Sequence, residues 1–206
     1  MSEQKRKVVL ITDGDEVASK TVQRVAEEVG GRCISRSSGN PTPLSGEGIV
    51  EQIKKAAYDP VLVMFDDCGN GGYGQGESAL RYVATHPEIE VLGAVAVASN
   101  TKSVSGAHID LSVDAHGEII QHAVNKDGDV EHAKESIVYG DTVDVLDELQ
   151  IPLIVGVGDI GKMHGQDDVK DGAPVTRQAV EIILQRSGFL DEPIIERTDT
   201  SETKKK

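Results

Sequence analysis

Four short apolar runs, rich in β-branched residues, are spaced along the chain. They cover residues 8–11, 61–65, 91–98 and 153–157. Their apolar positions are nearly continuous rather than alternating, which is typical of strands covered on both faces, as in a parallel sheet. A weaker run over residues 32–35 predicts a further strand.

Helical periodicity fills the intervals between these runs. Apolar residues recur at steps of three and four over residues 17–29, 49–57, 79–84 and 175–183. Strands that alternate with amphipathic helices build a sheet with helices on both faces. The pattern therefore predicts an α/β fold with a three-layer, doubly wound and mostly parallel sheet. Rossmann-like, flavodoxin-like and Toprim-like arrangements all fit it.

The middle of the chain does not follow this alternation of strands and helices. Apolar and polar residues alternate near residue 110, and the turn-forming sequences AHG and KDGD follow. This pattern predicts a β-hairpin insertion with one solvated face over about residues 107–130. Residues 143–149 predict a short helix before the last strand. We expect a single α/β domain over residues 1–190, followed by a disordered charged tail, residues 191–206.

The formal net charge of −14 argues against one large class of partners. Nucleic-acid binding uses Lys and Arg for phosphate contacts and aromatic side chains for base stacking, whereas this chain is strongly acidic and only 3% aromatic. The N-terminal apolar run is too short for a signal peptide, and no run approaches the roughly 20 residues that cross a bilayer. We expect no nucleic-acid partner and only peripheral contact with a membrane.

Carboxylates follow three of the predicted strands. Asp13 and Asp15 follow the first strand, Asp66 and Asp67 a later one, and Asp159 the last. Because the carboxyl ends of parallel strands lie at one edge of the sheet, where ligands bind, we expect up to five carboxylates to converge there. Crowded carboxylates share a hard cation or take up protons. The sequence thus predicts a candidate site for a hard cation such as Mg²⁺ and indicates no other cofactor.

The same aspartates have an alternative, structural interpretation. Asp13, Asp67 and Asp159 each precede a turn that contains glycine, where aspartate commonly caps helices and closes turns. Until the strand order is known, these acids need not be neighbours. Both interpretations stay open at the level of sequence.

Two enzyme templates match part of this layout. The layout resembles that of haloacid-dehalogenase phosphotransferases in three places: the sequence DGD after the first strand, Ser99 after a later strand, and Asp159 after the last strand with Asp167 and Asp168 beyond it. There the first aspartate is a nucleophile and the acids bind Mg²⁺. No lysine lies between Lys134 and Lys162, where that template requires one. Toprim-type sites also gather strand-end acids, but they serve nucleic-acid enzymes. The alternative function is a Mg²⁺-dependent phosphohydrolase or phosphotransferase with Asp13 as nucleophile or ligand.

A glycine-rich loop follows the 61–65 strand. Gly69, Gly71 and Gly74 satisfy the G-x-G-x-x-G spacing of dinucleotide-binding loops. Such a site also needs an acid at the end of the next strand, and that strand ends in Ala-Ser-Asn. Asp66 and Asp67, directly before the loop, would repel a pyrophosphate. We therefore predict a flexible turn at the binding edge, not a dinucleotide site.

Four segments taken together resemble the stage V sporulation protein AE family, the soluble AEa type of the SpoVA group in endospore-forming bacteria. In chain order they are ITDGDEVASKTVQRVA, SRSSGNPTPLSGEGIVEQIKKA, MFDDCGNGGYGQGE and GVGDIGKMHGQDD. The resemblance covers nearly the whole chain apart from the charged tail.

This resemblance implies a function, partners and a location. Membrane members of the group move dipicolinic acid with Ca²⁺ into the developing spore and out of it during germination. The AEa type is a soluble member at the outer surface of the spore inner membrane, with SpoVA membrane and soluble subunits as its partners. The resemblance implies that this protein is a non-enzymatic accessory protein that promotes germination, and it assigns no catalytic residues. The hypothesis that the strand-end acids bind Ca²⁺ follows from that cargo.

Overall fold

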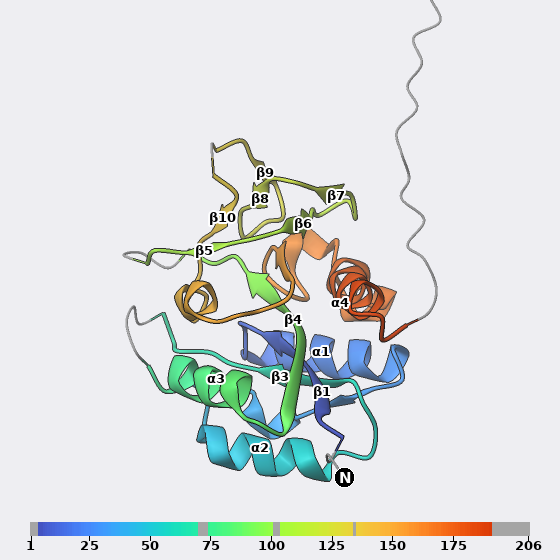
Figure 1. Cartoon of the computed structure of the whole chain (residues 1–206). Coiled ribbons are helices and arrows are strands. Elements are labelled where there is room, and N and C mark those ends of the chain that lie inside the picture. Colours follow the sequence, from blue (N-terminus) through green and yellow to red (C-terminus); the bar gives the residue numbers. More distant parts are fainter. Residues whose placement is uncertain (1–3, 70–73, 101–103, 134, 191–206) are drawn as a thin grey trace, which may run out of the picture.

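The centre of the molecule is a seven-stranded sheet (Figure 1). The computed structural model describes residues 4–69, 74–100, 104–133 and 135–190. The strand order is β2-β3-β1-β4-β11-β6-β7; β7 is antiparallel to β6, and the other neighbours are parallel. The mostly parallel sheet is therefore confirmed. Its strands are β1 (Arg6–Ile11), β2 (Arg32–Cys33), β3 (Val61–Met64), β4 (Ile89–Val97), β6 (Leu111–Val113), β7 (Ile119–Ile120) and β11 (Ile154–Val157).

Helices cover both faces of this sheet, which confirms the three-layer α/β fold. They are α1 (Glu16–Glu28), α2 (Gly46–Lys55), α3 (Gln75–Thr85) and α4 (Pro174–Arg186). α1 and α4 pack on one face, and α2 and α3 on the other (Figure 1). Ile11 of β1 belongs to the apolar core under α1 and α4, and its neighbour Leu10 to the core under α2 and α3. Because both faces are buried, the strand is apolar at successive positions.

The connections of two central strands run in opposite directions. β1 lies between β3 and β4, and α1 leads from β1 outward to β2 at one edge of the sheet. After β4 the chain passes instead to β6, on the other side of β11. Such a switch point opens a crevice at the carboxyl ends of the two strands, and it is where α/β sheets bind ligands.

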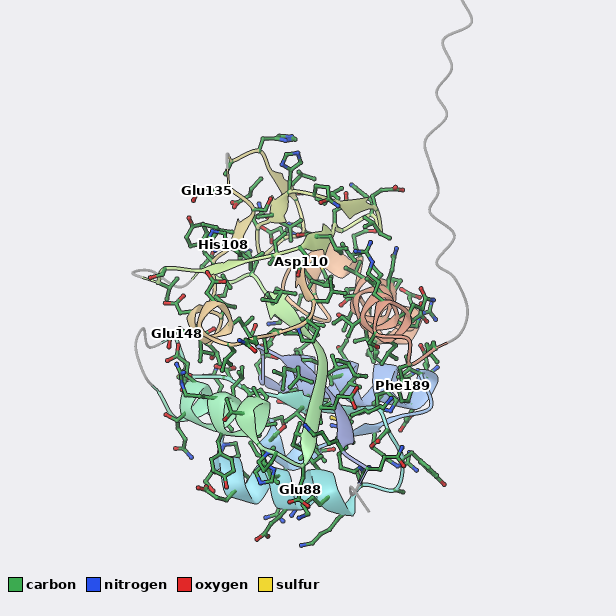
Figure 2. All side chains as sticks on the ribbon, in the orientation of Figure 1. Glu88, His108, Asp110, Glu135, Glu148 and Phe189 are labelled. Carbon is green, nitrogen blue, oxygen red and sulfur yellow. The ribbon has the colours of Figure 1, made fainter. Side chains whose placement is uncertain are left out.

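The region between β4 and β11 forms antiparallel pairs. The β6–β7 hairpin lies at the edge of the main sheet, whereas β8–β9 and β5–β10 are separate two-stranded sheets. The two hairpins, β6–β7 and β8–β9, span residues 111–131. The predicted short helix is the 3-10 helix η2. Asp147 of η2 accepts a hydrogen bond from the backbone N–H of His108 (2.9 Å), a residue that is labelled in Figure 2. The remaining elements are β5 (Ala107–His108), β8 (Ala123–Val124), β9 (Val130–Glu131), β10 (Ile137–Val138), η1 (Ser35–Ser37), η2 (Asp144–Glu148), η3 (Met163–Gly165) and η4 (Val169–Asp171).

Within the described ranges, no helix has the length and apolar character needed to cross a membrane. The predicted tail, residues 191–206, lies outside the described residues.

Candidate functional site

A cavity of about 540 Å³ opens at the carboxyl ends of β1, β3, β4 and β11. Strand register explains why acids gather there. β1 ends at Ile11, which pairs with Met64, the last residue of β3. Asp13 and Asp66 each lie two residues beyond these ends, and Asp159 lies two residues beyond the end of β11. The cavity is lined by Thr12, Asp13, Asp15, Asn40, Asp66, Gly69, Val97, Ala98, Ser99, Asn100, Lys126, Asp141, Asp159 and Lys162.

The structure brings together four of the five aspartates that the sequence singled out. Asp13, Asp15, Asp66 and Asp159 line this one cavity, whereas Asp67 is not among its lining residues. Three further charged groups at the site, Lys126, Asp141 and Lys162, were not predicted. The expectation of convergence is thus met for four acids, and their binding of a metal stays a prediction.

A lysine bridges two of the acids. Lys162 Nζ lies 2.7 Å from Asp15 Oδ2 and 3.0 Å from Asp159 Oδ1. These contacts raise the pKa of Lys162 although its partial burial opposes the rise. Burial raises the pKa of Asp15, but the hydrogen bonds from Lys162 and from the N–H of Ala18, together with the charge of Lys162, outweigh burial, and the pKa is lowered. One arm of the cavity is therefore a partly neutralised cluster, of one lysine and two carboxylates, that joins the start of α1 to the loop after β11.

Asp66 belongs to a second pair, without a lysine. Its side chain is hydrogen-bonded to the carboxyl group of Asp141, and its Oδ1 accepts the N–H of Cys68 (2.9 Å). Burial first, and then the nearby charge of Asp141, raise the pKa of Asp66 to about 6. Asp141 in turn accepts the N–H of Gly69 (2.6 Å). Asp66 therefore holds a proton more readily than an isolated carboxyl does.

Asp13 lies between these two clusters. Burial and the neighbouring charge of Asp15 raise its pKa to about 7, and a hydrogen bond from the Asp15 N–H (3.2 Å) opposes the rise. The charges of Asp159 and Asp66 raise it further. Asp13 and Asp66 are thus the carboxyls of the cavity that lose their protons only as the pH rises to about 7 and about 6, respectively.

Asp67 does not line this cavity. Its carboxylate instead caps the first turn of α3, which begins at Gln75. Asp67 is 2% exposed, and its carboxylate accepts the N–H groups of Gly76 (2.6 Å) and Glu77 (2.7 Å). Thr142 donates a longer hydrogen bond to it (3.4 Å). Burial and the charge of Asp67 raise the pKa of Glu77 to about 7. This agrees with the structural interpretation for Asp67, in which an aspartate caps a helix.

Backbone strain is concentrated beside the cavity acids. Cys68 and Thr142 have φ values of 59° and 63°, in the left-handed region that non-glycine residues rarely adopt. Cys68 is two residues after Asp66, and Thr142 directly follows Asp141. Conformations of this kind cost about 1–3 kcal/mol and cluster at functional sites. The strain sits where the Asp66–Asp141 pair is formed.

The acids that matched the end of the phosphotransferase template are structural. Asp167 is fully buried and accepts N–H groups of Gly161 (2.8 Å), Val175 (2.9 Å) and Thr176 (3.0 Å), which fixes the start of α4. It does not line the cavity. Ser99 of the same template does line it.

Some of the polar groups that line the cavity are suitable ligands for a hard cation. Asp13, Asp66 and Asp141 supply carboxylate oxygens, the ligand type that Mg²⁺ and Ca²⁺ prefer. In their present arrangement, no three His, Cys, Asp or Glu side chains of the described residues form a group that could hold a metal ion. A cation would bind by displacing protons from Asp13 and Asp66 and by drawing these groups closer together.

Fold and site together define a three-layer α/β protein with an acidic cavity at the switch point of its sheet. The family model of stage V sporulation protein AE1 matches residues 7–187, and the chain therefore belongs to this family. This confirms the family that the four sequence segments indicated, and it gives the protein a role in sporulation. No curated protein and no solved structure shows a significant match to the chain.

Proposed function

We propose that this protein is a non-enzymatic accessory subunit of the SpoVA dipicolinic acid channel complex. It acts at the outer surface of the spore inner membrane, contacts other SpoVA subunits and promotes germination. The observation that carries this proposal is the family match over residues 7–187. The association with SpoVA subunits and the germination role extend the sporulation role that the family gives.

The acidic cavity supplies a chemical task for such a subunit. Ca²⁺ accompanies dipicolinic acid as the cargo of the SpoVA group, and a divalent cation can replace the protons that Asp13 and Asp66 retain. Asp141 completes the carboxylates on this side of the cavity. Lys162 is already paired with Asp15 and Asp159, so those two acids are weaker ligands.

Deletion of the gene tests the accessory role directly. Dipicolinic acid release after a nutrient trigger is expected to slow in the deletion strain and to recover when the wild-type gene is restored. Restoration with Glu51→Gln, which changes an exposed acid on α2, is the matched control and should also recover release. Unchanged release kinetics in the deletion strain would remove the proposal.

Calcium binding is tested separately on the purified protein. Calorimetry should show saturable Ca²⁺ binding in the range of about 10⁻⁴–10⁻³ M, the range of weak, extracellular Ca²⁺-binding modules. Because the cation displaces protons, the measured heat should change with the ionisation enthalpy of the buffer. Asp66→Asn is expected to weaken binding at least about tenfold, whereas Glu51→Gln leaves it unchanged. No saturable heat up to that range rules out the cation site but leaves the accessory role to the genetic test.

One observation favours a second candidate, a Mg²⁺-dependent phosphohydrolase or phosphotransferase. The sequence placed no lysine at the required position, yet Lys162 reaches the cluster of strand-end acids, beside Asp13. In this function Asp13 attacks a phosphoryl group and the neighbouring acids hold Mg²⁺. A phosphatase screen with Mg²⁺ should then show turnover in wild type that Asp13→Asn abolishes. Absence of turnover across phosphomonoester substrates removes this candidate.

A further inference from the structure

Two histidines face each other across a hairpin that lies beside the acidic cavity. β8 and β9 pair with Ala123 opposite Glu131 and Val124 opposite Val130. Continuing this register by one residue sets His122 directly opposite His132. Both side chains are exposed, and residues directly opposite on an antiparallel pair project from the same face.

The two histidines occupy the closer of the two kinds of cross-strand position. At the turn end of the hairpin, the N–H of Asn125 donates to the carbonyl oxygen of Asp129 (3.0 Å). Hydrogen-bonded and non-hydrogen-bonded pairs alternate along the strands, so the His122–His132 pair, three steps further on, is non-hydrogen-bonded. Cβ atoms approach most closely at such positions. The ring centroids are accordingly 5.4 Å apart, with the ring planes inclined at 73°.

This separation matches what a shared metal ion requires. An ion about 2.1 Å from one ring nitrogen of each histidine lies about 3.2 Å from each ring centroid. A tetrahedral angle at the ion then places the centroids about 5.2 Å apart. The observed 5.4 Å is close to that value, so the rings need to turn but the strands need not move.

Hydrogen bonds hold the β8–β9 hairpin, which carries His122 and His132, in place. The side-chain oxygen of Asn125 accepts the N–H groups of Asp127 (2.9 Å) and Asp129 (3.1 Å) across the turn. Gly128 provides the left-handed residue, with φ of 80°, that such a three-residue turn needs. The carbonyl of Lys126 accepts the N–H of Asp159 (2.7 Å), which fastens the turn to the end of β11. Ligands held on a fixed scaffold lose less entropy on binding.

We propose that His122 and His132 form a surface site for a divalent transition-metal ion of the Zn²⁺ class. Imidazole nitrogen is a preferred ligand of Zn²⁺, Cu²⁺ and Ni²⁺ and a poor ligand of Mg²⁺ and Ca²⁺. Among the residues that the structure describes, no third His, Cys, Asp or Glu side chain joins the pair in a metal-binding group. Water therefore completes the coordination, and the ion clamps the open end of the hairpin whose turn lines the acidic cavity. The site is independent of the function proposed above.

Calorimetric titration of the full-length, tag-free protein with ZnCl₂ tests the site. Wild type is expected to bind one ion per chain. His122→Asn and His132→Asn each remove one of two protein ligands and are expected to weaken binding at least about tenfold. His116→Asn is the matched control, because it changes an exposed histidine outside the pair, at the turn after β6. A tenfold excess of CaCl₂ should not displace Zn²⁺.

Imidazole ¹H–¹⁵N spectra provide a second measurement that does not depend on heats. Addition of Zn²⁺ should shift the ring resonances of His122 and His132 and leave those of His116 in place. The proposal is overturned if wild type shows no saturable binding, or if both single variants bind as wild type does. It is also overturned if Asp13→Asn, in the acidic cavity, abolishes Zn²⁺ binding while His122→Asn does not. Thermal unfolding of each variant by circular dichroism checks that the fold is intact.

Discussion

At the residue scale, Asp66 and Asp67 are chain neighbours with different tasks. Asp66 turns into the cavity and shares a hydrogen bond with Asp141, while Asp67 turns to the start of α3 and accepts two backbone N–H groups. Successive residues at a strand end point to opposite faces. The first aspartate is therefore available to a ligand, and the second holds a helix in place.

Matched amide substitutions should separate these two tasks. Asp67→Asn presents an NH₂ group to one of two backbone donors and is expected to lower the free energy of unfolding by about 1–3 kcal/mol. Asp66→Asn is expected to be no less stable than wild type at pH 7.5. Its amide can donate to Asp141 the hydrogen bond that the protonated carboxyl donates, without the cost of a buried charge. Urea unfolding of both variants measures the difference, and equal losses would contradict the assignment.

Sequence could locate the acids of the site but not their orientation. Asp13, Asp66 and Asp159 were found because each follows a buried strand by two residues. The apolar pattern of the strand did not separate Asp66 from Asp67, because a strand covered on both faces has no polar alternation to tell one face from the other. The glycine-containing turn after Asp67 was the one signal of its structural task. Asp141 and Lys162 were missed because they lie in loops whose positions depend on contacts distant in the chain.

At the scale of elements, the glycines after β3 let a helix approach the end of a strand. A Cβ atom on Gly76 would lie 2.5 Å from the carbonyl oxygen of Asp66, and one on Gly74 would overlap the carboxylate of Asp67. The G-x-G-x-x-G spacing therefore has a structural cause at its end, while Gly71 lies outside the described residues. α3 begins where its first N–H groups meet Asp67.

Alanine at two helical glycines should have opposite effects. Gly76→Ala pushes a methyl group against backbone atoms that cannot move freely, and it is expected to lower the free energy of unfolding by about 1–3 kcal/mol. Gly48→Ala, in the first turns of α2, meets nothing closer than the Ser45 hydroxyl at 3.7 Å. It should raise the free energy of unfolding by about 0.5–1 kcal/mol. Urea midpoints measure both, and losses of similar size would show that close approach is not the cause.

Long helices and strands were predicted from the sequence better than short ones. The four apolar runs correspond to β1, β3, β4 and β11, and helical periodicity located α1 to α4. The two-residue strands β5, β7, β8, β9 and β10 are too short for any period to show. Residues 111–113, expected in a hairpin with one solvated face, form β6 beside β11, and Ser112 is fully buried. Residues that are remote in the sequence cover the face of β6 that was expected to be solvated.

At the scale of the whole molecule, acidic groups are crowded where the fold brings strand ends together. The net charge of −14 is spread over the chain, but three of the most perturbed acids lie at the carboxyl edge of the sheet. The pKa values of Asp13 and Glu77 are raised to about 7 and that of Asp66 to about 6. Folding therefore favours the protonated form of each group.

This crowding should make the protein less stable as pH rises from about 5 to 7.5. An acid whose pKa is raised in the folded state stabilises the fold below its unfolded pKa, and this stabilisation is lost as pH rises through the folded pKa. Between the two pKa values, each such group lowers the free energy of unfolding by up to about 1.4 kcal/mol per pH unit. Asp13→Asn removes one of the three groups and should flatten the curve by up to that slope.

Urea unfolding at intervals from pH 5 to pH 7.5 measures this slope, with Glu51→Gln as the exposed control that keeps the wild-type slope. A cation that binds the cavity stabilises the folded state by mass action. Ca²⁺ at millimolar concentration should therefore restore stability to wild type at pH 7.5, where Asp13 and Asp66 are ionised, and do so less at pH 5, where they are protonated. If Asp13→Asn kept the full wild-type slope, protonation of Asp13 would not be a source of the pH dependence. If Ca²⁺ stabilised wild type and Asp66→Asn equally, the cation would bind outside the acidic cavity.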